Sequence, residues 1–122
     1  MKLTPLHIVD TVADFYQVST VDLLSRSRQQ PLAYYRQVAM WTCRTCLDVP
    51  LSTLSAVFDR DHSTILHAFE RIKSIRLNPR DPLYHKVTAE TDQVMGRLRK
   101  ELYDANGPVL TPPPIPPWSA HV

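Results

Sequence analysis

The sequence predicts an all-α fold, a small helical bundle that contains a helix-turn-helix and is followed by one more helix and a proline-rich tail. Three observations support this class. Apolar residues recur every three or four positions along most of the chain before residue 106. Prolines and N-cap residues divide that pattern into helix-sized pieces. No stretch is rich in the alternating apolar and β-branched residues that are typical of strands.

The first two helices are marked by their N-terminal signals. Thr4 followed by Pro5 is an N-cap followed by the first helical position, and it predicts a helix over about residues 5–17. Ser19 with Asp22 three residues later resembles a capping box, which predicts a short second helix. The polar, basic segment "SRSRQQ" has no periodicity and is predicted to be a loop.

The third helix begins at Pro31 and carries two contrasting faces. An apolar stripe is predicted to face the core, and it comprises Tyr35, Val38, Ala39, Thr42, Cys43 and Cys46. Arg36, Met40 and Arg44 are each four residues apart and therefore share another face. We expect that face to be exposed.

Two further helices form the predicted helix-turn-helix. Pro50 restarts the chain before "LSTLSAVF", in which Leu51, Leu54 and Phe58 are predicted to face inward. The tight turn "DRD" leads to a helix over about 62–76. Its inward residues are predicted to be Ile65, Leu66, Phe69 and Ile72, and its outward residues Ser63, His67, Glu70, Arg71 and Ser74. A short helix, a tight turn and a second helix with a polar front edge are typical of a helix-turn-helix.

Asp61 is the expected N-cap of that second helix, because its carboxylate can accept hydrogen bonds from the first-turn amides. The neighbouring His62 and His67 raise the question of a metal site. They are five residues apart, about 140° around a helix, so the two rings do not share a face. We therefore expect no metal ligation here.

The last predicted helix covers about 83–103. Its apolar stripe comprises Leu83, Val87, Val94, Leu98 and Leu102, with Thr91 filling the gap and Gly96 weakening the helix. Two interpretations stay open: the stripe packs back onto the preceding domain, or it forms an interface with a second copy or another protein. The predicted division is a domain over 1–80, this helix within 81–105, and a flexible proline-rich tail over 106–122, in which Trp118 is a candidate docking residue.

Composition excludes several classes of protein. No apolar run is long enough to cross a bilayer, and the start of the chain lacks the apolar core of a signal peptide, so we expect a cytoplasmic, nucleoid-associated protein. Lys and Arg outnumber Asp and Glu by ten to seven in residues 1–80, a basic balance that is compatible with nucleic acid. The pair "CRTC" lies within a helix and is predicted to act as two small apolar residues. No nucleophile with a matching base is found, so an enzyme, a cofactor and a metal are not expected.

Two motifs together resemble a known family. "RDHSTILHA" and the upstream "LLSRSRQQPLAYYRQVAM" are similar to the C-terminal DNA-binding domain (domain IV) of the bacterial replication initiator DnaA, over about residues 5–78. That resemblance implies a helix-turn-helix bundle of the Trp-repressor type. It also implies recognition of double-stranded DNA at the DnaA box, a short site of TTATNCACA type.

The resemblance also implies roles for individual residues. Base edges would be contacted by Arg28 in the minor groove and, in the major groove, by Asp61, His62 and Ser63. Phosphates would be contacted by Arg26, Arg36, Gln37, Arg44, Thr64, His67 and Arg71.

The sequence also departs from the family pattern. Ser63 replaces the threonine of the family signature, the basic loop has fewer cations, and the turn "FDRD" is one residue shorter. The sequence contains no G-x-x-x-x-G-K-[ST] loop, so the expectation is a free-standing DNA-reading domain without an ATPase. Such a protein would compete with or assist DnaA, or regulate a promoter. The alternative is a module that binds DnaA or another replication factor through helix 83–103 and the tail.

Overall fold

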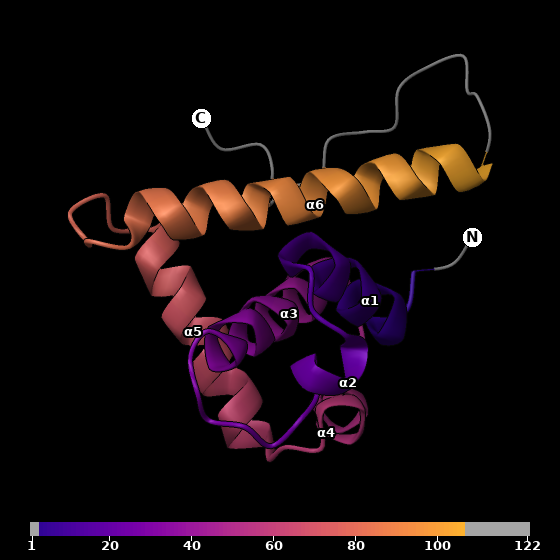
Figure 1. Ribbon diagram of the computed structural model, residues 1–122, viewed down its shortest axis with the longest axis horizontal. Helices are drawn as coiled ribbons and strands as arrows, with labels where there is room; N and C mark the ends of the chain where they lie inside the picture. Colours follow the sequence, from indigo (N-terminus) through magenta and orange to yellow (C-terminus); the bar gives the residue numbers. More distant parts are fainter. Residues whose placement is uncertain (1–2, 107–122) are drawn as a thin grey trace.

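The computed structural model describes residues 3–106, and that part of the chain consists of six helices and no strand (Figure 1). The helices are α1 (Pro5–Tyr16), α2 (Thr20–Leu23), α3 (Leu32–Cys46), α4 (Leu51–Phe58), α5 (His62–Arg76) and α6 (Tyr84–Asn106). The predicted all-α class is confirmed. The predicted boundaries hold to within three residues, because prolines and N-caps mark most helix starts.

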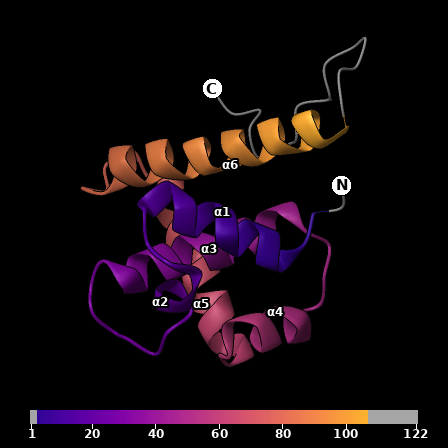
Figure 2. The ribbon, with the colours of Figure 1, turned by 45° about the vertical axis from the view of Figure 1, so that its right-hand side comes forward.

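The core lies where α3 contacts both α1 and α5 (Figure 2). Its largest fully buried side chains come from several helices and include Ile8, Leu23, Met40, Leu54, Phe58, Ile65 and Ile72. Burying aliphatic and aromatic side chains of this size is the main favourable term in folding. The helix-turn-helix is therefore fixed to the rest of the domain through α3.

Two predicted N-caps are confirmed and one is not. The Thr4 side chain accepts a hydrogen bond from the His7 amide at 3.2 Å, and the Ser19 side chain accepts one from the Asp22 amide at 3.0 Å. Asp61 occupies the N-cap position of α5 with extended backbone, but its side chain makes no capping hydrogen bond. The prediction that its carboxylate caps the helix is wrong, since the exposed side chain does not turn back over the first turn.

The inward face of α5 differs from the predicted one. Ala68 and Ile75 are buried together with Ile65 and Ile72, whereas Leu66 and Phe69 are only half-buried. The buried residues follow a spacing of three and four, which is the narrow seam of one helix packed along another. The wider stripe expected from the sequence is wrong, because α5 packs chiefly on one neighbour, α3.

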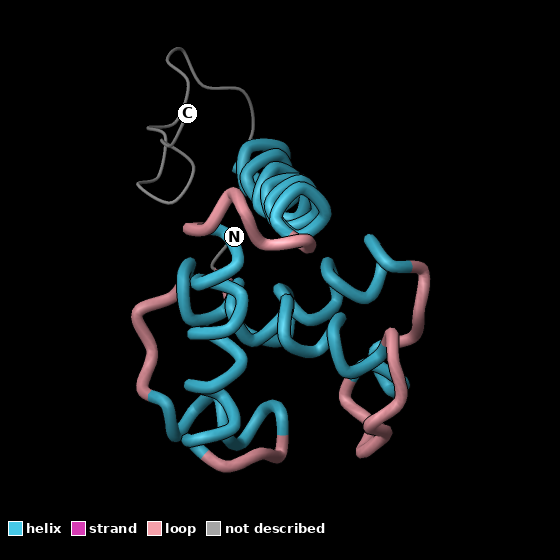
Figure 3. Tube along the Cα trace, turned by 90° about the vertical axis from the view of Figure 1, so that its left-hand side faces the viewer, coloured by secondary structure: helices cyan, strands magenta, loops and turns pink. Residues whose placement is uncertain are grey.

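The helix α6 lies across the rest of the molecule and contacts α1, α3 and α5 (Figures 1 and 3). Val87, Thr91, Val94 and Leu98 are buried as predicted, and Met95 is buried in addition. The ends of the predicted stripe are wrong: Leu83 is 40% exposed and Leu102 is half-buried. Of the two interpretations of this stripe, packing within the chain is the one observed.

Polar contacts fix α6 in place. Glu90 accepts hydrogen bonds through Oε1 from the hydroxyls of Tyr16 at 2.7 Å and Tyr34 at 3.0 Å. Burial, together with these hydrogen bonds, raises the pKa of Tyr16 well above its usual value, so its hydroxyl stays a donor. Arg76 donates to Asp92 at 2.9 Å and lies 4.9 Å from the Trp41 ring. Partly buried charged hydrogen bonds of this kind specify one docking position as well as stabilising it.

Gly96 in α6 can be replaced without a clash, because a Cβ built there meets nothing within 4 Å. Gly96→Ala is expected to raise the free energy of unfolding by about 0.5–1 kcal/mol, since alanine loses less backbone entropy in a helix. Urea unfolding measures the change. Ala89→Gly, at an exposed position of the same helix, is the matched control and should lower the stability by a similar amount. A destabilised Gly96→Ala variant would contradict the open space at this position.

Asn106, predicted as the first residue of the proline-rich tail, is the last residue of α6, and the rest of that predicted tail, including Trp118, lies outside the described residues. Within residues 3–106, no helix is both long and apolar enough to cross a membrane.

Candidate nucleic-acid interface

The turn between α4 and α5 is short, and one of its residues has a left-handed backbone conformation. Asp59 ends α4 in the left-handed conformation, with φ 52° and ψ 52°. Aspartate tolerates this region better than most residues because its short side chain hydrogen-bonds locally. The buried Leu54 and Phe58 of α4 and Ile65 of α5 then set how the two helices cross. The predicted helix-turn-helix is therefore present.

The first turn of α5 presents polar side chains that are free to bind a ligand. Asp61, His62, Ser63 and Thr64 are all exposed. None of them uses its side chain in a hydrogen bond or ion pair within the described part of the chain. Short polar side chains at the front of a helix have the size and chemistry to meet base edges in a major groove.

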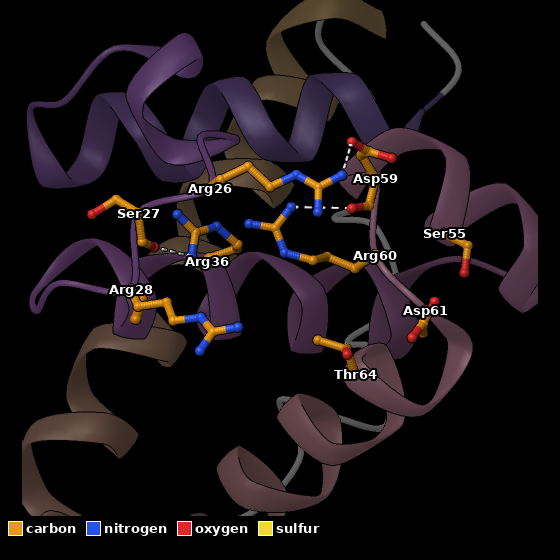
Figure 4. A pocket seen from close by; sticks show the side chains of 10 residues that line it. Arg26, Ser27, Arg28, Arg36, Ser55, Asp59, Arg60, Asp61 and Thr64 are labelled. Atoms are coloured by element: carbon orange, nitrogen blue, oxygen red, sulfur yellow. Dashed lines mark hydrogen bonds and ion pairs between the residues drawn. The ribbon is translucent and has the colours of Figure 1, made fainter.

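A cleft of about 700 Å³ separates this turn from the basic loop between α2 and α3 (Figure 4). Its lining brings together four arginines and two carboxylates, namely Arg26, Arg28, Arg36, Arg60, Asp59 and Asp61. Figure 4 shows these arginines reaching the cleft from the loop, from α3 and from the turn. The excess of positive charge favours an anionic ligand.

Arg60 joins the loop to the turn. Its Nη1 donates to the carbonyls of Phe58 at 2.9 Å and Asp59 at 3.1 Å, and its Nη2 donates to the carbonyl of Ser25 at 2.8 Å. One guanidinium thus holds backbone from both sides of the cleft. Arg60 is not among the residues predicted for the site, although it is the first residue of "RDHSTILHA".

Arg36 is buried rather than exposed. Only 6% of its surface is accessible, and its Nε and Nη1 donate to the carbonyls of Leu23 at 2.9 Å and Ser27 at 3.0 Å. Burial, and then the nearby charge of Arg60, lowers the pKa of Arg36. Nη2 is buried without a partner among the described residues, so a phosphate could reach it only if that atom were uncovered.

The predicted exposed face of Arg36, Met40 and Arg44 is therefore wrong. Met40 is 2% exposed, and only Arg44 lies at the surface. The physical reason is that the end of α2 and the loop after it lie over this part of α3, and the Arg36 guanidinium donates to a carbonyl of each. Arg44 lies apart from the cleft, with its guanidinium 6.0 Å from the Phe69 ring.

The two remaining loop arginines are accessible. Arg26 forms an ion pair with Asp59, but both side chains are about three-quarters exposed, at 74% and 77%. An exposed pair of this kind contributes little stability and is readily exchanged for another anion. Arg28 is exposed and makes no hydrogen bond or ion pair within residues 3–106.

A second hollow continues the cleft along α3 and α5. We call it the α3/α5 groove, and its lining includes Gln37, Arg60, Thr64, His67 and Arg71. Thr64, His67 and Arg71 follow one another at helical spacing along the exposed side of α5. The described residues that line this groove include no carboxylate. The structure thus brings together most of the predicted phosphate contacts, with Arg44 separate and Arg36 buried.

The two cysteines are free thiols, and Cys43 is fully buried while Cys46 is half-buried. Burial raises the pKa of both thiols, that of Cys46 to about 12, so they remain uncharged at neutral pH. This agrees with the predicted role as small apolar residues. Among residues 3–106, no group of three or more His, Cys, Asp or Glu side chains is placed to hold a metal ion.

Comparison with known proteins places this geometry in context. Residues 5–72 match the family model described as bacterial dnaA protein helix-turn-helix. The chromosomal replication initiator protein DnaA of Tropheryma whipplei (strain Twist) is 39% identical over 74 residues, which cover 61% of this chain and 16% of that protein. The DnaA of Cutibacterium acnes is 34% identical over 93 residues, covering 75% of this chain and 18% of the relative.

The DnaA of Aromatoleum aromaticum is 36% identical over 96 residues, which cover 78% of this chain and 20% of that protein. The chain therefore spans only 16–20% of the length of these relatives.

Proposed function

Because the chain belongs to the bacterial DnaA protein helix-turn-helix family, we propose that it binds double-stranded DNA at sites resembling the DnaA box. The observation that carries this proposal is the uncommitted polar first turn of α5 beside a cleft rich in arginine. Occupying such sites would compete with or assist a replication initiator, or regulate a promoter that contains them. Binding to DNA in any of these ways needs no catalytic residue.

In the proposed complex, the first turn of α5 enters the major groove. Asp61 accepts hydrogen bonds from an exocyclic amine such as that of cytosine, and His62 and Ser63 donate to or accept from purine edges. None of the three side chains must break a hydrogen bond within the described protein to do so. Ser63 lacks the methyl group that a threonine would pack against a thymine methyl. Its discrimination between bases therefore depends on hydrogen bonding.

Arg28 is proposed to enter the adjacent minor groove. It is exposed and without a partner on the loop, and the narrow minor groove of A·T-rich DNA attracts a guanidinium. Arg36 and Arg60 set where the loop lies relative to α5, because both donate to its main-chain carbonyls. We therefore assign Arg36 to positioning the loop rather than to the phosphate contacts.

Phosphates are proposed to lie along the α3/α5 groove and at two outlying arginines. The donors in the groove are Gln37, Thr64, His67 and Arg71. Arg26 exchanges its weak pair with Asp59 for a phosphate, and Arg44 contacts the backbone elsewhere. Contacts of this kind position the protein and make its affinity depend on salt.

Fluorescence anisotropy with labelled duplexes tests the proposal. At physiological salt, a DnaA-box duplex should bind on the order of 10³-fold more tightly than a scrambled duplex of equal composition. Equal affinities for the two duplexes would contradict sequence-specific binding.

Arg44→Ala is expected to weaken binding to box and scrambled duplexes equally, because a phosphate contact carries no base information. The slope of log K against log salt should become less negative by about 0.9. Lys100→Ala, an exposed lysine of α6 outside the cleft and groove, is the charge-matched control and should leave the slope unchanged. A loss confined to the box duplex would show instead that Arg44 reads sequence.

A further inference from the structure

We propose that α6 adds a phosphate contact to the DNA-binding surface, with Lys86 binding the backbone of the same duplex. Residues 5–72 match the family model, so this contact lies outside the matched helix-turn-helix. The inference rests on the proposed function and extends its site.

The surface that would carry the backbone is continuous. The arginine-lined cleft and the α3/α5 groove share Arg36, Arg60 and Thr64 along their linings. The groove in turn shares Gln37 and Arg71 with a third hollow, which we call the α6 hollow. The α6 hollow is lined on its far side by Leu83, Lys86 and Val87. The three hollows therefore form one path from the basic loop to the start of α6.

The path lacks negative charge beyond the first cleft. The described residues that line the α3/α5 groove and the α6 hollow include no carboxylate. The cations on the last part of the path are Arg71 and Lys86, and both side chains are exposed. Neither forms an ion pair within residues 3–106. Their charge is therefore available to an anion.

Lys86 contacts an aromatic ring and forms no ion pair within the described residues. Its Nζ lies 4.9 Å from the centroid of the Tyr34 ring, a cation–π contact that orients the ammonium group. Glu90, one turn further along α6, directs Oε1 to the hydroxyls of Tyr16 and Tyr34 rather than to Lys86. The aromatic face thus favours a positive charge at the end of the path.

The order of donors along the path favours a polyanionic strand over a single small anion. Thr64, His67 and Arg71 are spread over about 10 Å of α5, given a rise of 1.5 Å per residue. Lys86 follows beyond Arg71, across the α6 hollow. A row of separated donors without acids matches the repeated phosphates of a duplex backbone.

The test compares Lys86→Ala with Lys100→Ala, which removes the same charge from α6 outside the hollow. Affinities are measured over a range of salt for a minimal box duplex and for box duplexes lengthened at either end by one helical turn, about 10 bp. Lys86→Ala should make the salt slope less negative by about 0.9 on at least one lengthened duplex. Its preference for box over scrambled sequence should not change.

The proposal is overturned if Lys86→Ala and Lys100→Ala give the same slopes on every duplex, which is also the outcome expected if the α6 hollow binds an acidic protein segment. Thermal unfolding followed by circular dichroism checks that both variants remain folded. The proposed function is tested separately, on the unsubstituted protein, and it fails if that protein does not prefer the box duplex to the scrambled one. The Lys86 contact is tested by the salt dependence of affinity, which can be measured on duplexes of any sequence.

Discussion

Arg60→Ala is expected to lower the affinity for a box duplex roughly 10- to 100-fold. The guanidinium joins the carbonyls of Phe58 and Asp59 in the turn to that of Ser25 in the loop. Hydrogen bonds to a charged group contribute about 1.5–3 kcal/mol, and every 1.4 kcal/mol corresponds to a tenfold change in affinity. Without them, the loop no longer holds Arg28 at a fixed place relative to α5.

Two controls separate this positioning role from a simple loss of charge. Arg60→Lys keeps the charge but cannot reach all three carbonyls, so it should recover only part of the affinity. Arg26→Ala removes the exposed pair with Asp59 and the proposed phosphate contact, but it leaves the hydrogen bonds that position the loop in place. It should therefore leave preference for the A·T end of the box intact. Anisotropy with box duplexes altered at the A·T end measures that preference. If Arg60→Ala instead weakened all duplexes equally, Arg60 would be a phosphate contact and not a positioning residue.

His62→Ala is expected to cost about 1–3 kcal/mol of binding free energy on the box duplex and to leave binding to a scrambled duplex unchanged. The side chain is exposed at the start of α5 and makes no hydrogen bond within the described protein. Its removal should therefore not change folding stability, and the lost affinity can be attributed to a base contact. Anisotropy on both duplexes and a thermal unfolding curve measure the two quantities.

Ser74→Ala is the matched control, because Ser74 is exposed near the other end of α5 and lies outside the cleft and groove. It should bind both duplexes as the unsubstituted protein does. An equal loss of affinity for box and scrambled duplexes in His62→Ala would place His62 at a phosphate instead of a base edge.

Local signals made most of the fold predictable. Proline at the first helical position, and Thr4 and Ser19 as N-caps, act within one helical turn, so they can be read from neighbouring residues alone. The helix-turn-helix was predictable for the same reason, since Pro50 and the short turn delimit two helices. The exposed first turn of α5 followed from the motif around His62.

What the sequence could not predict depends on contacts between distant residues. Arg36 matches the family motif and has the spacing of a surface residue, but carbonyls at Leu23 and Ser27 take its donors and bury it. Arg60 binds a carbonyl 35 positions away in sequence. Main-chain carbonyls are present at every residue, so nothing in the sequence identifies which of them an arginine will meet.

The packing of α6 was likewise not predictable from the sequence. An apolar stripe indicates that something covers it, but not whether the cover is the same chain or another molecule. The structure answers through particular polar pairs, such as Glu90 with Tyr16 and Tyr34. These pairs join residues more than fifty positions apart, at separations of 74 and 56.

Base reading by α5 and the basic loop is tested with box duplexes from which single groove atoms have been removed. A 7-deazapurine lacks the N7 acceptor of the major groove, and 3-deazaadenine lacks the N3 acceptor of the minor groove. We expect that a 7-deazapurine at the position contacted by His62 weakens the unsubstituted protein but not His62→Ala. We likewise expect that 3-deazaadenine at the A·T end weakens the unsubstituted protein but not Arg28→Ala. If both analogues weakened all three proteins equally, or weakened none of them, α5 and the basic loop would not read DNA in the way proposed here.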